Sequence, residues 1–335
     1  MSRRPTLLLG LAGFTSLLFL IGIAVGSSFM PFDRVLSAIM GSGSRADGII
    51  VWNLRAPRVV LAALAGACLA VAGVLLQRAT RNPLAAPSVL GIVDGAAVGV
   101  LAFFVLFSNE ANALVVSIYW QPLAAVLGAL IFAGIVTTLY LNDQASPMRL
   151  IFYGVALAAL ANAFVVLTII AGPVYRASQA LIWLAGSVHE AEWRDAYILG
   201  AVCLVAAPLL AWMRRDLDQM RLDDQSGAAT GLAVNRVRFG AFALSVFLTA
   251  AAVSVVGGIG FVGLIAPHLA RLAFGSGAAM QMTGAALFGA MIVLAADVFA
   301  RLAFQPLEVP TGAITALIGA PYFIYILIRQ GRAHA

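Results

Sequence analysis

Long apolar runs without a single charged side chain recur along the whole chain. A helix needs about 20 apolar residues to cross a bilayer. Such runs occur at Leu7–Val25, Val59–Leu76, Ala111–Leu141, Leu150–Val174, Ala196–Met213, Leu272–Ala296 and Val309–Ile328, and Val89–Ser108 is interrupted only by Asp94. The run Phe239–Ala270 is too long for one span, and Gly257–Gly260 divides it into a full helix and a short one. The pattern predicts about ten transmembrane helices at this length per span.

The composition supports a membrane-embedded chain. Of the 335 residues, 62% are hydrophobic and only 10% are charged, whereas soluble domains carry about 25% charged residues. A soluble protein of this composition would expose large apolar patches and aggregate. We therefore expect an all-α, polytopic membrane protein that contacts lipid and forms a single transmembrane domain over residues 1–335.

The charged residues exclude several functions. All 20 basic residues are arginines, so the chain lacks the lysine of a P-loop ATPase and cannot form a lysine Schiff base. The arginines are scattered between apolar runs without a basic stripe, which argues against nucleic-acid binding. With alternating spans, more arginines lie on the side of the two termini than on the other side. The positive-inside rule then predicts that both termini are cytoplasmic.

The most polar part of the chain is Arg214–Arg238, called here the polar segment. Its centre contains acidic residues followed by small ones: Leu222, Asp223, Asp224, Ser226, Gly227, Ala228, Ala229, Thr230, Gly231 and Leu232. One interpretation is a solvated loop with some helix in it. The other is a short helix whose small residues dock into a groove on a cytoplasmic partner.

Two features of the third predicted span have different interpretations. Gly91, Gly95 and Gly99 recur every four residues, and small residues on one helix face let backbones approach closely in lipid. We interpret them as helix-packing residues. Asp94 is either a functional carboxylate inside the membrane or a residue held by the positive end of its helix. No grouping of histidine, cysteine or carboxylate residues predicts a catalytic centre or a metal site.

Several short motifs occur in a fixed order along the chain. They are Arg55–Arg58, Gln77, Arg81–Pro87, Leu90–Gly91, Gly258–Leu264, Pro267–His268, Arg271, Ala296–Arg301, Glu308–Gly312 and Gly319–Pro321. From about residue 50 onward, this ordered set resembles the FecCD family of bacterial permeases, which import iron-siderophores, haem and vitamin B12. The segment Ile182–Ser187, followed by Trp193, is more similar to the iron-siderophore permeases of that family than to the vitamin B12 permeases, and the haem permeases have similar segments.

The resemblance implies the permease fold of a type II ABC importer in the bacterial inner membrane. Two permeases, identical copies or paralogues, would surround a central pathway. Two cytoplasmic ATPase subunits would bind ATP and Mg²⁺, so this chain would be neither an enzyme nor a binder of any cofactor. A periplasmic binding protein would deliver the cargo.

The resemblance also assigns roles to individual residues. Arg55, Arg58 and Arg301 match periplasmic arginines that meet glutamates of the binding protein. Leu222–Leu232, called here the coupling segment, matches the segment that inserts into a cleft of the ATPase. The family often has a basic residue before the final small-Gly pair of this segment, whereas this chain has Ala228–Gly231.

The expected cargo is an iron(III)-siderophore, with haem or vitamin B12 as alternatives. An ion-gradient-driven secondary transporter is the competing function. Such transporters usually have ionisable residues near the membrane midplane at broken helices. Asp94 is the one candidate of that kind, and the broken stretch Gly257–Gly260 has no acidic residue nearby.

Overall fold

In the computed structural model, the described residues are 3–26, 29–109, 113–143, 147–171, 174–303 and 309–333. These residues are almost entirely helical, and their one β feature is an isolated bridge between Ser108 and Leu114. The helices are α1 (Arg3–Ala24), α2 (Phe32–Ile39), α3 (Arg45–Ile49), the π-helix η1 (Ile50–Arg55), α4 (Ala56–Thr80), α5 (Ile92–Leu106), the 3₁₀-helix η2 (Ile118–Trp120), α6 (Gln121–Asp143), α7 (Pro147–Ala171), α8 (Val174–Ala185), α9 (Trp193–Gln219), α10 (Asp224–Ala229), α11 (Val234–Val256), α12 (Val262–Phe274), α13 (Ala278–Ala303) and α14 (Thr311–Ala333).

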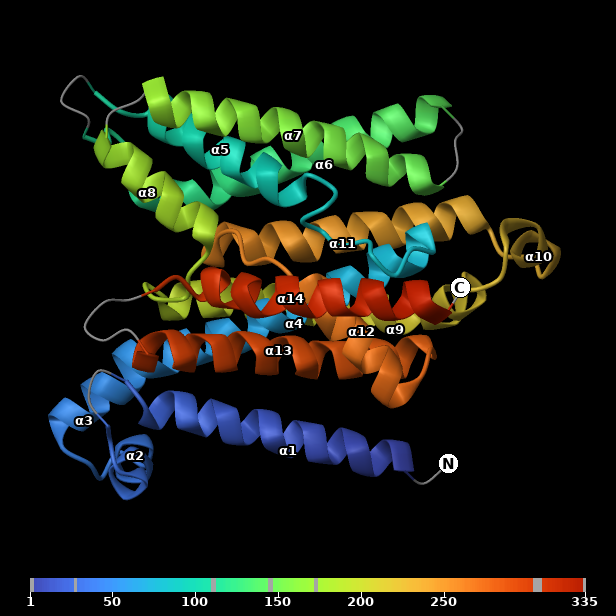
Figure 1. Cartoon of the computed structure of the whole chain (residues 1–335). Coiled ribbons are helices and arrows are strands. Elements are labelled where there is room, and N and C mark those ends of the chain that lie inside the picture. The colour runs from blue at the N-terminus through green and yellow to red at the C-terminus, as the bar shows by residue number, and fades with distance from the viewer. Residues whose placement is uncertain are drawn as a thin grey trace.

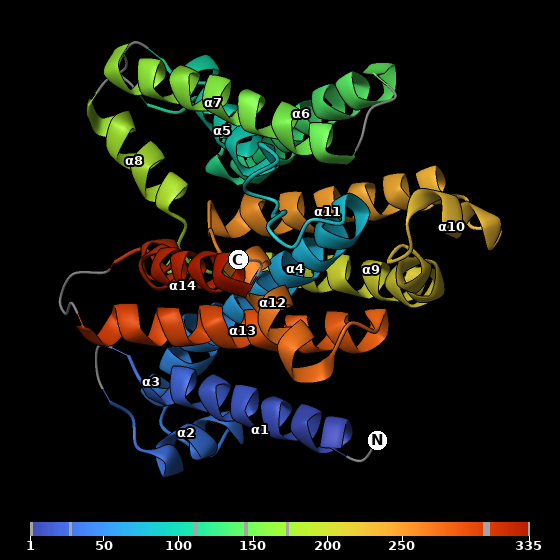
Figure 2. The same ribbon diagram turned by 45° about the vertical axis from the view of Figure 1, so that its right-hand side comes forward.

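The predicted all-helical membrane fold is confirmed. Within the described residues, 7 helices are long and apolar enough to cross a membrane. Shorter apolar helices occupy Ile92–Leu106, Val262–Phe274 and Thr311–Ile326, which are the remaining predicted spans. Figure 1 shows the long helices running side by side, with α5–α8 on one side of the bundle and α1 with α13 on the other. The rotated view in Figure 2 shows the same order of layers.

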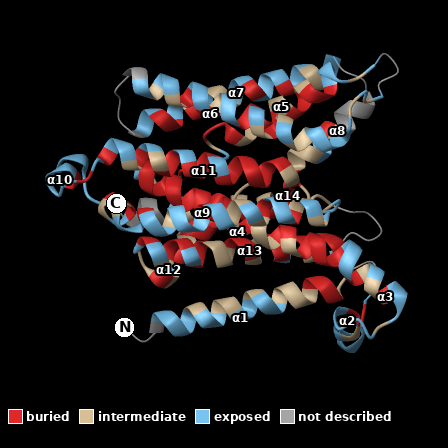
Figure 3. Cartoon of the chain, turned by 180° about the vertical axis from the view of Figure 1, so that it is seen from behind, coloured by how far each residue is buried: buried red, intermediate tan, exposed pale blue. Residues whose placement is uncertain are grey.

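Helix α4 lies at the centre of the bundle. It packs against α9, α11, α12 and α13, and nearly all of its residues are buried, as the red colour in Figure 3 shows. A Cβ atom added at Gly66 would collide with the backbone of Gly289 on α13, and one at Gly73 would collide with the backbone of Gly263 on α12. These glycines therefore bring main chains into direct contact, as small residues do between membrane helices.

The predicted break in the run Phe239–Ala270 is also present. Helix α11 ends at Val256, and α12 begins at Val262. Gly257 has a φ of 69°, a backbone conformation that glycine adopts at little cost. A Cβ atom there would meet the carbonyl oxygen of Trp183, so the main chain at the break packs directly against the end of α8.

Some predicted boundaries were wrong. The apolar run Leu272–Ala296 predicts one span, but Leu272–Phe274 finish α12 and the next helix begins only at Ala278. Gly275 ends α12 with a φ of 80°, and the hydrophobicity of the sequence alone does not predict such a turn. The amphipathic helix α2 and its neighbour α3 were not predicted, because neither is an apolar run. Glu308 of the C-terminal motif lies outside the described residues.

Candidate functional site

The first candidate site lies where α1 ends, α4 begins and α13 ends. It consists of Arg55, Arg58, Asp297 and Arg301, called here the arginine cluster. The three arginines are only 6%, 7% and 7% exposed, and Asp297 is 0% exposed. The cluster therefore brings together residues that are up to 246 positions apart in the sequence, because α4 and α13 pack along their whole length.

Two of these arginines bind the C-terminal carbonyl groups of α1. Nη1 of Arg55 donates to the carbonyl oxygens of Ile23 at 2.9 Å and Ala24 at 2.8 Å. Nη1 of Arg301 donates to the carbonyl oxygens of Gly22 at 3.0 Å and Val25 at 2.8 Å. The last four carbonyl groups of a helix lack partners within the helix, and the negative end of its dipole favours cations. The arginines thus fix the end of α1 to the bundle.

The other ionic contacts of the cluster converge on Asp297. Arg58 reaches Oδ1 of Asp297 through Nε at 2.9 Å and Nη2 at 2.8 Å. Arg301, four residues further along α13, reaches Oδ2 at 2.7 Å. Nη1 of Arg58 also lies 3.0 Å from Nδ1 of His189. Two of the three guanidinium groups bind the carboxylate, and two bind the partly negative end of α1. One carboxylate and one helix end do not balance three cations, so the site is positively charged.

The π-helix η1 ends at Arg55 of this cluster, and Pro57 explains its position. Ala56 donates its backbone N–H to Val51, five residues back. In the same pattern, the carbonyl of Trp52 would accept from residue 57, which as a proline has no N–H. The indole Nε1 of Trp193 supplies the missing donor at 2.7 Å. The helix can therefore continue from Arg45 to Thr80 through a proline.

The predicted docking role of Arg55, Arg58 and Arg301 stays a prediction. The structure gathers these arginines at one end of the bundle, as that role requires. Each of them is buried and bound to groups of its own chain. Arg45 and Arg194, which the sequence analysis did not select, lie at the same end and are exposed. Their position outside the apolar runs was the signal that could have identified them.

The second candidate site is the coupling segment at the opposite end of α4. Residues Asp224–Ala229 form the short helix α10, which Figure 1 shows projecting from the bundle. Asp223 is its N-cap and accepts from the backbone N–H of Ser226 at 2.8 Å and from its hydroxyl at 2.7 Å. These two donors hold the pKa of Asp223 below its usual value. Ala228, Ala229 and Thr230 are exposed.

The remaining residues of the coupling segment turn the chain back into the bundle. Leu232 is buried and packs with Met220 and Val234, and Gly227 is buried in the middle of α10. Gly231 has a φ of 85°, so another residue would be strained there although the space around it is open. Leu222 is 42% exposed. The polar segment is thus an ordered hairpin of helices that presents small residues outward.

The glycines of the third span have two different environments. A Cβ atom at Gly95 would lie 2.6 Å from Cβ of Phe132, and one at Gly99 would collide with the backbone of Ala124; both contacts are with α6. Gly91 was expected on the same helix face, but it precedes α5 as its N-cap with a φ of 71°. It lies against α7, where a Cβ atom would be 3.1 Å from the carbonyl oxygen of Gly154.

Asp94 has a polar partner on a neighbouring helix. Its Oδ1 accepts from Nδ2 of Asn162 on α7 at 3.2 Å. The residue lies in the first turn of α5, where the helix dipole favours a negative charge. The geometry agrees with the structural interpretation of Asp94, and Asn162 is a partner that the sequence gave no reason to expect.

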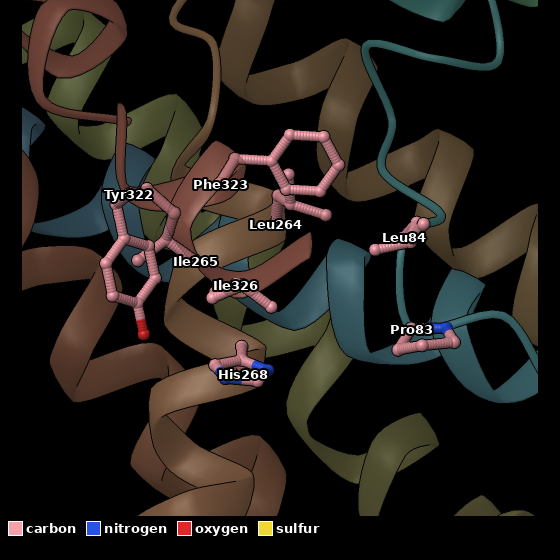
Figure 4. A pocket seen from close by; sticks show the side chains of 8 residues that line it. All are labelled: Pro83, Leu84, Leu264, Ile265, His268, Tyr322, Phe323 and Ile326. Atoms are coloured by element: carbon pink, nitrogen blue, oxygen red, sulfur yellow. The ribbon is translucent and has the colours of Figure 1, made fainter. Parts of the chain in front are cut away.

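A small, shallow hollow opens between the loop after α4, α12 and α14. Figure 4 shows the side chains that surround it. Its lining is mostly apolar and consists of Pro83, Leu84, Leu264, Ile265, His268, Tyr322, Phe323 and Ile326. Nδ1 of His268 lies 3.2 Å from Nη2 of Arg271. No group of three or more potential metal ligands occurs among the described residues.

Comparison with known proteins extends the resemblance found in the sequence. Residues 14–329 match the FecCD transport family, so the match begins earlier than residue 50. The chain is 40% identical over 319 residues, 95% of its length, to the probable siderophore transport system permease protein YfhA of Bacillus subtilis, of which 93% is covered. It is 39% identical over 308 residues to the achromobactin transport system permease protein CbrC of Dickeya dadantii, covering 92% of this chain and 87% of that protein.

A solved structure gives the same fold. A chain from a metal-chelate type ABC transporter in an inward-facing conformation superposes with a TM-score of 0.85 at 28% identity, covering 97% of this chain and 99% of that one. The family match therefore spans nearly every helix described above, including both candidate sites. The chain belongs to the FecCD transport family.

Proposed function

We propose that this chain is the transmembrane permease subunit of an ABC importer that carries iron(III)-siderophore complexes across the bacterial inner membrane. The observation that carries the proposal is the 40% identity over 95% of the chain to a siderophore permease. Relatives named for achromobactin, iron(III) citrate and hemin support an iron chelate as cargo. The siderophore supplies the iron ligands itself, so the pathway needs none of its own.

The two candidate sites fit the two partners of such an importer. The exposed small residues at the end of α10 would contact a cytoplasmic ATPase. The positively charged arginine cluster lies at the opposite end of the bundle, where an acidic binding protein would dock. With α10 on the inside, both termini are cytoplasmic. Two copies of the permease, or this chain and a paralogue, enclose the pathway, and ATP with Mg²⁺ binds to the ATPase subunits.

The direct test is uptake by the reconstituted complex. The permease is purified with the ATPase and the binding protein encoded beside it, and uptake of ⁵⁵Fe-loaded siderophores, haem and cobalamin into proteoliposomes is compared. We expect ATP-dependent uptake of a ferric siderophore, unchanged by a protonophore. Uptake without ATP that collapses with the proton gradient would instead support the secondary transporter.

The docking role is tested by charge reversal at Arg58. Arg58→Glu weakens binding of the delivery protein at low salt, because charge complementarity steers encounter and fixes register. The change also breaks the contact with Asp297, so loss of binding alone does not prove docking. The decisive observation is that a Glu→Arg change on the delivery protein restores its binding to the Arg58→Glu permease. A permease with a damaged fold would not regain binding in this way.

The coupling role is tested at Ala228. Ala228→Trp places a bulky side chain on the exposed face of α10 and should abolish substrate-stimulated ATP hydrolysis. Gly231 is less suitable, because any substitution at its φ of 85° also strains the backbone. Normal substrate-stimulated hydrolysis in the Ala228→Trp complex would refute the role.

A further inference from the structure

The end of α4 and the coupling segment are joined by one carboxylate. Asp224, the first residue of α10, lies 2.6 Å from Nη2 of Arg81. On its other side, Nη2 of Arg238 donates to Oδ1 of Asp224 at 2.8 Å and to Oδ2 at 3.1 Å. Arg81 directly follows α4, and Arg238 lies in the first turns of α11. The carboxylate therefore bridges two helices that belong to the bundle.

Both arginines are also held by contacts with groups other than Asp224. Nε of Arg238 donates to the carbonyl oxygen of Ala79 at 3.1 Å, and its Nη1 donates to Oδ1 of Asn235 at 3.1 Å. Nε of Arg81 donates to the carbonyl oxygen of Met220 at 3.0 Å. The ends of α4 and α9 and the start of α11 thus form a preset socket of two cations, into which the carboxylate of α10 fits.

The three partners differ in their exposure to solvent. The side chain of Arg238 is 5% exposed and that of Arg81 is 29% exposed, whereas that of Asp224 is 48% exposed. Partial burial raises the pKa of Asp224, but Arg238 and Arg81 outweigh this effect and hold its pKa below the usual value. The carboxylate is therefore ionised at neutral pH and attaches a peripheral helix to a buried socket.

Helix α4 extends this attachment through the bundle. At 1.5 Å per residue, its 25 residues span about 37 Å. Near its far end, Arg58 is bound to Asp297 on α13. Near its end at the socket, Nη1 of Arg78 donates to the carbonyl oxygen of Leu217 at 2.7 Å, and its Nη2 donates to Oε1 of Gln281 at 2.8 Å. Polar contacts thus hold α4 at both ends.

We propose that Asp224 is a positioning residue that fixes the coupling segment to α4 and α11, so that displacement of α10 by the ATPase moves α4. This inference rests on the proposed function and adds a specific residue to it. Without the carboxylate, α10 still folds on its N-cap and still presents its small residues to the ATPase. Its displacement, however, is taken up by the loops around it and does not reach the bundle.

The test uses the complete importer in proteoliposomes and three variants. Asp224→Asn removes the charge at nearly constant shape, and Asp224→Glu keeps the charge. Asp216→Asn is the matched control, because Asp216 lies on the same end of the bundle and forms no ion pair within the described residues. Transport and ATP hydrolysis are measured in the same vesicles, and their ratio is the readout. A change in the amount of folded complex alters both rates but leaves their ratio unchanged.

We expect Asp224→Asn to retain bound ATPase and to lower the ratio of transport to hydrolysis about 5-fold or more, which is the lower end of typical coupling between sites. Asp224→Glu should recover most of the ratio, and Asp216→Asn should match the wild type. An unchanged ratio in Asp224→Asn, or an equal loss in Asp224→Glu, would overturn the inference. If the wild-type complex itself transports no iron chelate under ATP, the proposed function fails instead.

Discussion

Removing the charge of Asp297 should destabilise the fold strongly. Asp297 is 0% exposed and contacts Arg58 and Arg301, whose side chains are 8% and 7% exposed. Asp297→Asn leaves two buried cations facing an amide. Breaking a buried ion pair costs about 3–5 kcal/mol, and because the amide oxygen still accepts one bond, we expect about 3 kcal/mol, the low end of that range. Since 1.36 kcal/mol corresponds to a factor of ten, this loss raises the equilibrium constant of unfolding about 150-fold.

The measurement is equilibrium unfolding of the purified chain in mixed micelles with an increasing fraction of a denaturing detergent. Asp47→Asn is the control, because it removes the same charge from an ion pair in which Asp47 is 6% exposed but its partner, Arg34, is 55% exposed. An ion pair with one partner in solvent contributes less than a fully buried pair, so this variant should lose clearly less stability than Asp297→Asn. A loss in Asp297→Asn no larger than in Asp47→Asn would refute the reasoning. It would mean that water or lipid headgroups reach the arginine cluster.

Three other changes have definite expected outcomes. Gly99→Ala should push α5 away from α6 and lower the free energy of unfolding by about 1–3 kcal/mol through overpacking. Gly134→Ala on α6 is the control, because a Cβ atom there meets nothing within 4 Å. It should leave the free energy of unfolding, measured in the same way, unchanged or slightly higher. The sulfur atoms of Cys68 and Cys203 lie 3.3 Å apart. The membrane-permeant oxidant diamide should therefore join both thiols in a disulfide and lower the intact mass of the protein by about two hydrogens. If both thiols can still be alkylated after denaturation, this proximity is contradicted. The pKa of Asp223 is lowered, so its cap stabilises α10 fully above about pH 4, the unfolded-state value, and this stabilisation is lost as the pH falls through the folded-state pKa. A spin label on α10 should therefore gain mobility only in acid; unchanged mobility after the carboxylate has been protonated would show that the cap is dispensable.

The sequence was sufficient for the number and order of the spans, because crossing a bilayer demands apolar length and a helix must satisfy its own backbone. It was also sufficient for the break at Gly257, since consecutive glycines interrupt a helix. It could not locate the end of α12 at Gly275, where the apolar residues continue past a turn. Helix α2 was missed because it is amphipathic and follows no long apolar run.

The candidate sites were predicted less completely than the fold. The motifs selected Arg55, Arg58 and Arg301, but arginine placement relative to an apolar run does not reveal whether the side chain faces outward or binds a neighbouring helix. The pairing of Asp297 with Arg301 follows from their spacing of four residues. By contrast, Asp224 meets Arg81, which is 143 positions earlier, and only the tertiary packing of α4 brings them together.

The glycine contacts of α4 restrict how the protein can change shape. At Gly66 and Gly73 its main chain touches α13 and α12 with no side chain between them. Sliding α4 along either neighbour would drive carbonyl oxygens into adjacent peptide groups, whereas pivoting about these crossings keeps the same atoms in contact. We therefore expect any motion of α4 relative to α12 and α13 to be a rotation about these crossings. A rotation about a point near the middle of a helix moves both of its ends, so a push on one end of α4 would also displace the other end.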